Sequence, residues 1–196
     1  DDVGSISLKV TATDLVGASV SQTFAVAVAN TNDAPVIATL LTGQVATEDA
    51  AFTCTVPVDA FADVDAGDAL GYSATLANGD PLPSWLSFNA TTRTFSGTPA
   101  NDDVGSISLK VTAADLVGAS VSQTFAVRVA NVNDAPTGTV VIAGTATQNQ
   151  VLTASNTLAD VDGLGTVGYR WQSSTDGTTW SAISGATTNT FTLSEA

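Results

Sequence analysis

The chain has no histidine, no methionine and one cysteine, and only 5 of its 196 residues are basic, against 19 acidic ones. Without histidine there is no imidazole to act as a general base, to pair with a catalytic serine or cysteine, or to bind a metal. Five scattered basic side chains cannot neutralise a run of phosphates, and a net charge of −14 disfavours anionic membrane surfaces. We therefore expect no nucleic acid partner, and no direct membrane insertion, since no stretch approaches ~20 apolar residues.

The single cysteine, Cys54, cannot form an internal disulfide. It alternates with apolar residues in the segment 52–56, so we expect its side chain to face a core. No basic residue adjoins it in the sequence to lower the thiol pKa, and a reactive cysteine is not expected.

A long internal repeat organises the chain. Residues 1–35 and 102–136 are identical at all but three of 35 positions, at an offset of 101 residues. The differing pairs are Thr13 and Ala114, Ala27 and Arg128, and Thr31 and Val132. A period of this length is typical of one all-β domain, and near-identity between copies indicates a tandem array, as in stalks and multivalent binders.

The repeat predicts the domain organisation. Residues 1–35 are expected to supply the last two strands of one unit, 36–136 to form a complete unit, and 137–196 to form part of a divergent third unit. The chain is expected to be a fragment of a larger secreted protein.

Each part of the unit has the pattern of strands and turns. Apolar and polar residues alternate through 107–111 and 125–129, the period of half-buried strands. Earlier strands are expected at 36–41, 52–56, 69–76, 86–88 and 93–96. Turn residues separate them and no helical period occurs, so the prediction is an all-β, two-sheet antiparallel sandwich.

Acidic and amide side chains gather at the two ends expected of this sandwich. In an up-and-down strand order, one end holds Asp63, Asp65, Asp68 and Asp115 beside an incoming linker with Asn30, Asn32 and Asp33. The other end holds Glu48, Asp49, Asp102 and Asp103 beside an outgoing linker with Asn131, Asn133 and Asp134, and Asp160 and Asp162 of the third unit.

Clustered carboxylates repel one another unless a cation is present. Ca²⁺ takes 6–8 oxygen ligands from carboxylates, amides and carbonyls, whereas Mg²⁺ prefers a strict octahedron and zinc lacks its usual histidine or cysteine ligands here. Calcium is the expected cofactor. The alternative is that Asp and Asn merely favour turns and that acidity keeps a secreted protein soluble.

Three ordered segments, Phe61–Leu70, Leu82–Phe88 and Phe95–Pro99, followed by Asn133-Asp134-Ala135-Pro136, resemble the dystroglycan-type cadherin-like domain, which is grouped with bacterial Ig repeats. The segment 137–196 resembles another Ig-like repeat of large bacterial surface proteins. The resemblance implies tandem Ig-like or cadherin-like antiparallel β-sandwiches, with calcium at the module junctions and roles in adhesion or polysaccharide binding.

The resemblance also assigns ligands. Asn131, Asn133 and Asp134 match the cadherin linker pattern D-x-N-D-x-P, with asparagine in place of its first aspartate, as also at Asn30. Asp63 and Asp65 resemble its D-x-D, Asp115 the aspartate of its A-x-D, and Glu48 a glutamate near the first strand. Gln148-Asn149-Gln150 stands in the third unit where the complete unit has Glu48-Asp49, so a site at the far end of that unit is not expected.

The function expected is a non-catalytic, calcium-stiffened stalk segment of an extracellular bacterial adhesin, whose partners are neighbouring repeats. The alternative is a module that binds polysaccharide or a like module on another cell, attached in some cases to a secreted polysaccharide-degrading enzyme. Trp85 and Trp180 are candidate stacking platforms, although core packing is expected for both and for Trp171. Asp63 and Asp65 lie too close together for separate acid and base roles, so catalysis is not expected.

Overall fold

A computed structural model of the chain describes residues 3–65, 67 and 69–194. The chain divides into two units, Asp1–Ala130 and Asn131–Ala196. Within the described residues every regular element is a β-strand, apart from the short 3-10 helix η1 (Asn101–Asp103). The predicted all-β class is confirmed. No helix in this part of the chain is long and apolar enough to cross a membrane.

The first unit begins with the hairpin β1 (Gly4–Thr13) and β2 (Ser19–Val28), which pair antiparallel with Leu8 opposite Phe24. The Asp14 carboxylate closes the turn, because its Oδ1 accepts the N–H groups of Val16 and Ala18 at 3.0 and 2.8 Å. All ten residues of β1 are exposed.

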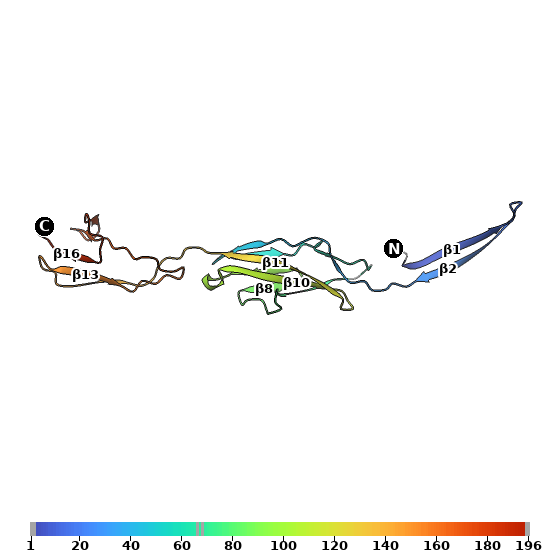
Figure 1. The fold of residues 1–196 in the computed structure, drawn as a ribbon, viewed down its shortest axis with the longest axis horizontal. Helices are drawn as coiled ribbons and strands as arrows, with labels where there is room; N and C mark the ends of the chain where they lie inside the picture. Colours follow the sequence, from blue (N-terminus) through green and yellow to red (C-terminus); the bar gives the residue numbers. More distant parts are fainter. Residues whose placement is uncertain (1–2, 66, 68, 195–196) are drawn as a thin grey trace. The chain divides into compact units, whose positions relative to one another are not determined.

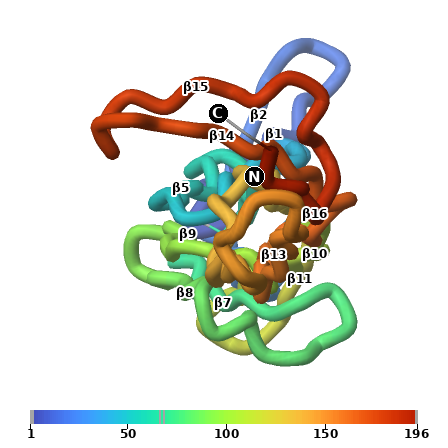
Figure 2. The backbone as a smooth tube through the Cα atoms, turned by 90° about the vertical axis from the view of Figure 1, so that its left-hand side faces the viewer, coloured from blue at the N-terminus to red at the C-terminus, as the bar shows by residue number. Residues whose placement is uncertain are grey.

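A sandwich follows the hairpin. One sheet has the order β4 (Gln44–Thr47), β11 (Ser120–Ala130), β10 (Gly105–Ala114) and β7 (Gly71–Leu76). The second sheet has the order β5 (Phe52–Thr55), β9 (Thr94–Gly97) and β8 (Leu86–Asn89), and a short pair joins β3 (Val36–Ile37) to β6 (Phe61–Ala62). Figure 1 shows the paired strands β10 and β11, and Figure 2 shows β5, β9 and β8 along one side of the sandwich with β10 and β11 on the other.

The core of the sandwich forms where alternate residues of both sheets meet. Phe95, Leu109 and Val127 are completely buried, and the rings of Phe95 and Phe125 lie 5.8 Å apart across the two sheets. Gly97 passes so close to the backbone of Trp85 that no side chain would fit at this position.

Hydrogen bonds from a buried glutamine take the place of strand pairing in part of the expected first strand. The prediction of a strand over 36–41 is wrong beyond residue 37, because Gln123 of β11 takes the backbone groups that a ladder would use. Its Oε1 accepts the N–H of Leu41 at 3.0 Å, and its Nε2 donates to the carbonyls of Thr39 and Ala60 at 3.0 and 3.2 Å. Beyond this segment the chain leaves the short β3–β6 pair and enters the four-stranded sheet as β4.

After this crossing, β4 pairs with β11 in parallel. Neither β4 nor β6 was predicted from the sequence pattern, and the expected antiparallel sandwich is corrected to a mixed one. The strands β5, β7, β8 and β9 lie within two residues of their predicted bounds, whereas β10 and β11 extend well beyond the predicted 107–111 and 125–129. β9 begins at Thr94 because Arg93 adopts a positive φ of 56°.

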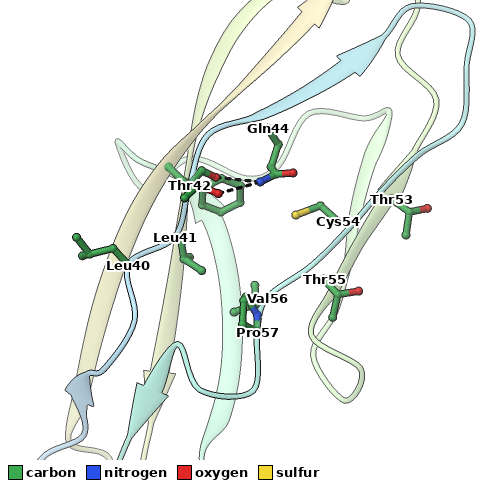
Figure 3. Close-up of a pocket in the computed structure, with 10 residues that line it drawn as sticks. Leu40, Leu41, Thr42, Gln44, Thr53, Cys54, Thr55, Val56 and Pro57 are labelled. Carbon is green, nitrogen blue, oxygen red and sulfur yellow. Dashed lines mark hydrogen bonds between the residues drawn. The ribbon is translucent and has the colours of Figure 1, made fainter.

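Cys54 is half-buried and packs against the core, as expected. Its side chain lines a hollow of about 280 Å³ beside β4 and β5, together with Leu41 and Gln44 (Figure 3). Burial raises the pKa of the thiol, which disfavours the reactive thiolate.

The second unit holds a three-stranded sheet, β12 (Val140–Ala143), β13 (Val151–Asn156) and β16 (Thr190–Thr192), and a short pair, β14 (Gln172–Ser173) and β15 (Ser181–Ala182). Trp171 immediately precedes β14. It is half-buried, stacks on Phe191 at 5.3 Å and donates its indole N–H to Thr188. The prediction that Trp180 packs in the core is wrong, because this residue is 58% exposed.

The repeat supplies a matched pair of stability mutants. Leu109→Ala empties a fully buried position and is expected to lower the free energy of unfolding by about 3 kcal/mol. Leu8→Ala changes the corresponding residue of β1, which is 43% exposed, and is expected to cost less than about 1 kcal/mol. Urea unfolding followed by Trp85 fluorescence, with Trp171 and Trp180 changed to Phe, measures both. Equal losses would contradict the burial described here.

Candidate functional site

The linker that follows β2 meets the loops after β6 and β10 at one end of the sandwich. Asp65 is only 8% exposed and binds the linker through both carboxylate oxygens. Its Oδ1 accepts the Asn30 side-chain N–H at 2.9 Å, and its Oδ2 accepts the Asp33 backbone N–H at 2.7 Å. A buried carboxylate is thus compensated by amide N–H groups of the linker.

Asp115 closes the same site from the β10–β11 turn and is 7% exposed. Its Oδ1 accepts the backbone N–H groups of Val117, Gly118 and Ala119 at 2.7–3.0 Å, and its Oδ2 accepts the Asn32 side-chain N–H at 3.0 Å. The Asn32 hydrogen bond, followed by those from the turn, holds the pKa of Asp115 below its usual value although burial acts in the opposite direction.

Asp63 is held less completely. Its Oδ1 accepts the Asp65 backbone N–H at 2.9 Å, whereas its Oδ2 is buried and has no hydrogen-bond partner among the described residues. A buried carboxylate oxygen without a partner is costly, so this atom indicates a missing positive group. Asp68, a predicted member of this cluster, lies outside the described residues.

The second unit repeats this geometry within itself. Asp162 Oδ2 accepts the Asp134 N–H at 2.6 Å, and Asp160 Oδ1 accepts the Asp162 N–H at 2.9 Å. Asn133 donates to the Asp134 carbonyl at 2.8 Å, as Asn32 does to Asp33 at 2.9 Å. Two divergent sequences thus build the same linker–loop contact around their D-x-D segments.

Four more predicted residues of the first unit lie at the opposite end of its sandwich, where β11 finishes. Glu48 is buried and its backbone N–H binds the Ala130 carbonyl at 3.0 Å. Asp49 N–H binds the Pro99 carbonyl at 2.9 Å, which brings the loops before and after the β5–β9–β8 sheet together. Asp103 accepts the Ala100 N–H at 2.9 Å, whereas Asp102 is exposed. Asn131, in the second unit, is also exposed.

The two candidate tryptophans differ. Trp85 is half-buried against the core and meets Phe52 edge-on at 6.2 Å, so its ring is a packing element. Trp180 leaves most of its ring in solvent.

Arg93 and Tyr72, which no sequence pattern indicated as functional, come together from the sides of opposite sheets. The Arg93 guanidinium lies 5.7 Å from the centre of the Tyr72 ring. The sequence could have drawn attention to Arg93, because the chain has only 5 basic residues and each is therefore a candidate for a specific role.

The fold is that of Ig-like and cadherin-like domains. The structure is similar to extracellular cadherin domains 1–4 of protocadherin gamma B7, with a TM-score of 0.52 and 17% identity over 97% of this chain and 49% of that one. For extracellular cadherin domains 1–5 of protocadherin gamma B2 the TM-score is 0.52 and the identity 15%, over 87% and 36%. An endo-fucoidan hydrolase of glycoside hydrolase family 107 gives a TM-score of 0.42 and 24% identity, over 67% and 19%.

This chain therefore spans half or less of each of these solved structures. Residues 34–130 match the family described as "Putative Ig domain", and residues 142–196 match a domain family of unknown function, DUF8696. No curated protein matches the chain. The family match covers the sandwich that carries Asp63, Asp65 and Asp115.

The lowered pKa of Asp115 predicts acid sensitivity of the docked linker. Because its pKa is lower in the folded protein than the ~3.9 of an unfolded chain, ionised Asp115 stabilises the fold above that pH. This contribution is lost as the pH falls through the lowered pKa. In EDTA, Asp115→Asn is expected to flatten this part of the acid limb in urea unfolding, whereas Asp102→Asn, at an exposed position, should leave it unchanged.

Proposed function

We propose that this chain is a non-catalytic, calcium-binding segment of an extracellular bacterial adhesin, built from dystroglycan-type cadherin-like repeats. The observation that carries this proposal is the docking of the linker on Asp65 and Asp115, beside the unpartnered oxygen of Asp63. The Ig-like and cadherin-like fold supports a module without catalysis of its own.

The residues at the linker fit a hard cation. Asp63, Asp65 and Asp115 provide carboxylate oxygens, and no lysine or arginine is among the hydrogen-bond partners described for them. Asn30 and Asn32 now donate N–H groups, but an amide can present its oxygen instead when a cation is bound. All these ligands are oxygen atoms, which Ca²⁺ prefers, and zinc would find neither histidine nor a cysteine cluster.

Calcium would stiffen the junction between repeats. The ion would supply the positive charge that the carboxylates lack and would tie the linker to the loops of the following repeat. Asp134, Asp160 and Asp162 would serve in the same way at the next linker. Neighbouring repeats of the same protein are thus the first partners, in a stalk outside the bacterial cell.

The hairpin β1–β2 is assigned to a preceding repeat. Its sequence is nearly identical to that of β10–β11. In β10–β11 the residues Leu109, Val111 and Val127 are fully buried by the rest of the sandwich. In this assignment residues 1–35 end one repeat, 36–136 form the next and 137–196 belong to a divergent third.

A second candidate function is binding to a polysaccharide or to a like module on another cell. The observation that favours it is Trp180, a large aromatic ring that is 58% exposed beside β15. Exposed aromatic side chains offer apolar contact area to the faces of sugar rings.

Calcium is expected to stabilise the first unit. For one site at a free Ca²⁺ concentration of ten times the dissociation constant, the gain is about 1.4 kcal/mol, and the dissociation constant is expected at ~10⁻⁴–10⁻³ M. Asp65→Asn keeps the shape of the side chain and should abolish most of the gain. Urea unfolding with Ca²⁺ against EDTA measures it.

Asp80→Asn is the matched control, since Asp80 is an acidic residue in an exposed turn far along the chain from the linker. It should respond to calcium like the unaltered chain. Unchanged stability of the unaltered chain up to 10 mM Ca²⁺, with unchanged linker flexibility in X-ray scattering, would rule out the calcium proposal.

The polysaccharide alternative predicts that Trp180→Ala weakens retention on an insoluble polysaccharide about two- to tenfold. Trp85→Phe, which keeps an aromatic ring against the core, should retain the unaltered affinity. Pull-down on insoluble polysaccharides measures both. Equal retention of Trp180→Ala and the unaltered chain would exclude Trp180 as the platform.

A further inference from the structure

A shallow hollow of about 460 Å³ opens at the side of the first sandwich, between the start of β7 and the β8–β9 turn. Its described lining consists of Leu70, Gly71, Tyr72, Ala90, Thr91 and Arg93. The position joins the two sheets, because Tyr72 belongs to the four-stranded sheet and Arg93 immediately precedes β9 of the other.

Arg93 is held over this hollow by two contacts. Its Nε donates to the Val56 carbonyl at 3.4 Å, and its guanidinium lies 5.7 Å from the centre of the Tyr72 ring. The terminal guanidinium nitrogens have no hydrogen-bond or ion-pair partner among the described residues, and neither do the hydroxyls of Tyr72 and Thr91. Three different polar groups therefore line one hollow, and the described part of the chain leaves their hydrogen-bonding capacity unused.

The backbone of Arg93 adds a second observation. Its φ of 56° lies in the left-handed region, which favours glycine and is unfavourable for a residue with a side chain. An arginine is placed here at that cost, and its side chain reaches across to the opposite sheet.

The described lining of the hollow carries a positive charge, opposite in sign to the net charge of the chain. No acidic side chain is among its described lining residues, although the net charge is −14. Of the five basic residues, Lys9, Arg128 and Arg170 are exposed, and Lys110 is half-buried on β10. Arg93 is also half-buried and is the basic residue that lines this hollow. A planar guanidinium matches the two oxygens of a carboxylate in a way that a lysine cannot.

We infer that this hollow binds the carboxylate of an acidic sugar, a uronic acid unit of a polysaccharide. Arg93 binds the carboxylate, while the hydroxyls of Thr91 and Tyr72 bind ring hydroxyl groups of the same sugar. A sugar fits better than a peptide, because these side-chain groups match a hydroxylated ring and the small residues Gly71 and Ala90 leave room for it.

The described lining of the hollow includes neither a proposed calcium ligand nor Trp180, so its test is run in EDTA. The unaltered chain is titrated with a galacturonic acid trimer and followed by NMR through the amides of Gly71 and Thr91. Saturable shifts are expected with this trimer, and no saturation with a neutral galactose trimer, which lacks the carboxylate.

Arg93→Gly removes the guanidinium at a backbone conformation that glycine adopts freely, so the fold is kept. It should weaken binding at least about tenfold, since the charged hydrogen bonds are lost. Arg93→Lys keeps the charge without the planar fork and should also bind more weakly. Arg128→Ala, the matched control, removes an exposed positive charge from β11 and should bind as the unaltered chain does.

Three results would overturn the inference. One is the absence of saturable binding by the acidic trimer. The second is equal affinity of Arg93→Gly and the unaltered chain. The third is tighter binding of an acidic tripeptide than of the sugar trimer, which would assign the hollow to a protein partner.

Discussion

The burial of carboxylate groups where a linker meets a sandwich is the constraint on which this structure depends. Asp65 and Asp115 are more than nine-tenths buried, and the chain has only 5 basic residues that could pair with buried carboxylates. Their negative charge is met by N–H groups: the Asp33 backbone, the amides of Asn30 and Asn32, and the backbone of the β10–β11 turn. The linker therefore cannot leave without exposing or orphaning these groups. The position of the linker therefore depends on whether the carboxyl groups of Asp65 and Asp115 are ionised.

The two copies of one hairpin separate what local sequence decides from what its surroundings decide. β1–β2 and β10–β11 have the same residues at nearly every position and form the same paired ladder, with Leu8 opposite Phe24 and Leu109 opposite Phe125. Strand, register and turn are thus properties of the local sequence. Burial is not, since Leu109 is enclosed by the other sheet while Leu8 is exposed. A hydrophobic pattern indicates which face can be buried, and the remainder of the sandwich decides whether it is.

Most of the strands and the grouping of acidic residues could be predicted, because alternation has a fixed period and loops at one end of a sandwich meet there. β4 and β6 escaped prediction, since they are short and depend on where the chain changes sheets, which Gln123 decides through contacts more than 60 residues distant in sequence. The roles of Asn30 and Asn32 were expected to be those of oxygen ligands, whereas here they donate hydrogen. An amide carries both functions, and composition alone cannot distinguish them. The exposure of Trp180 depends likewise on packing that its own segment does not encode.

The parallel pairing of β4 with β11 has a mechanical consequence. β4 lies near the start of the sandwich and β11 at its end, and they share four paired residues, from Gln44 with Val127 to Thr47 with Ala130. Because the two strands run in the same direction, a pull on the entering and leaving ends of this domain slides them past each other. Their hydrogen bonds are then loaded together in shear, instead of breaking one after another as they would if the strands were peeled apart.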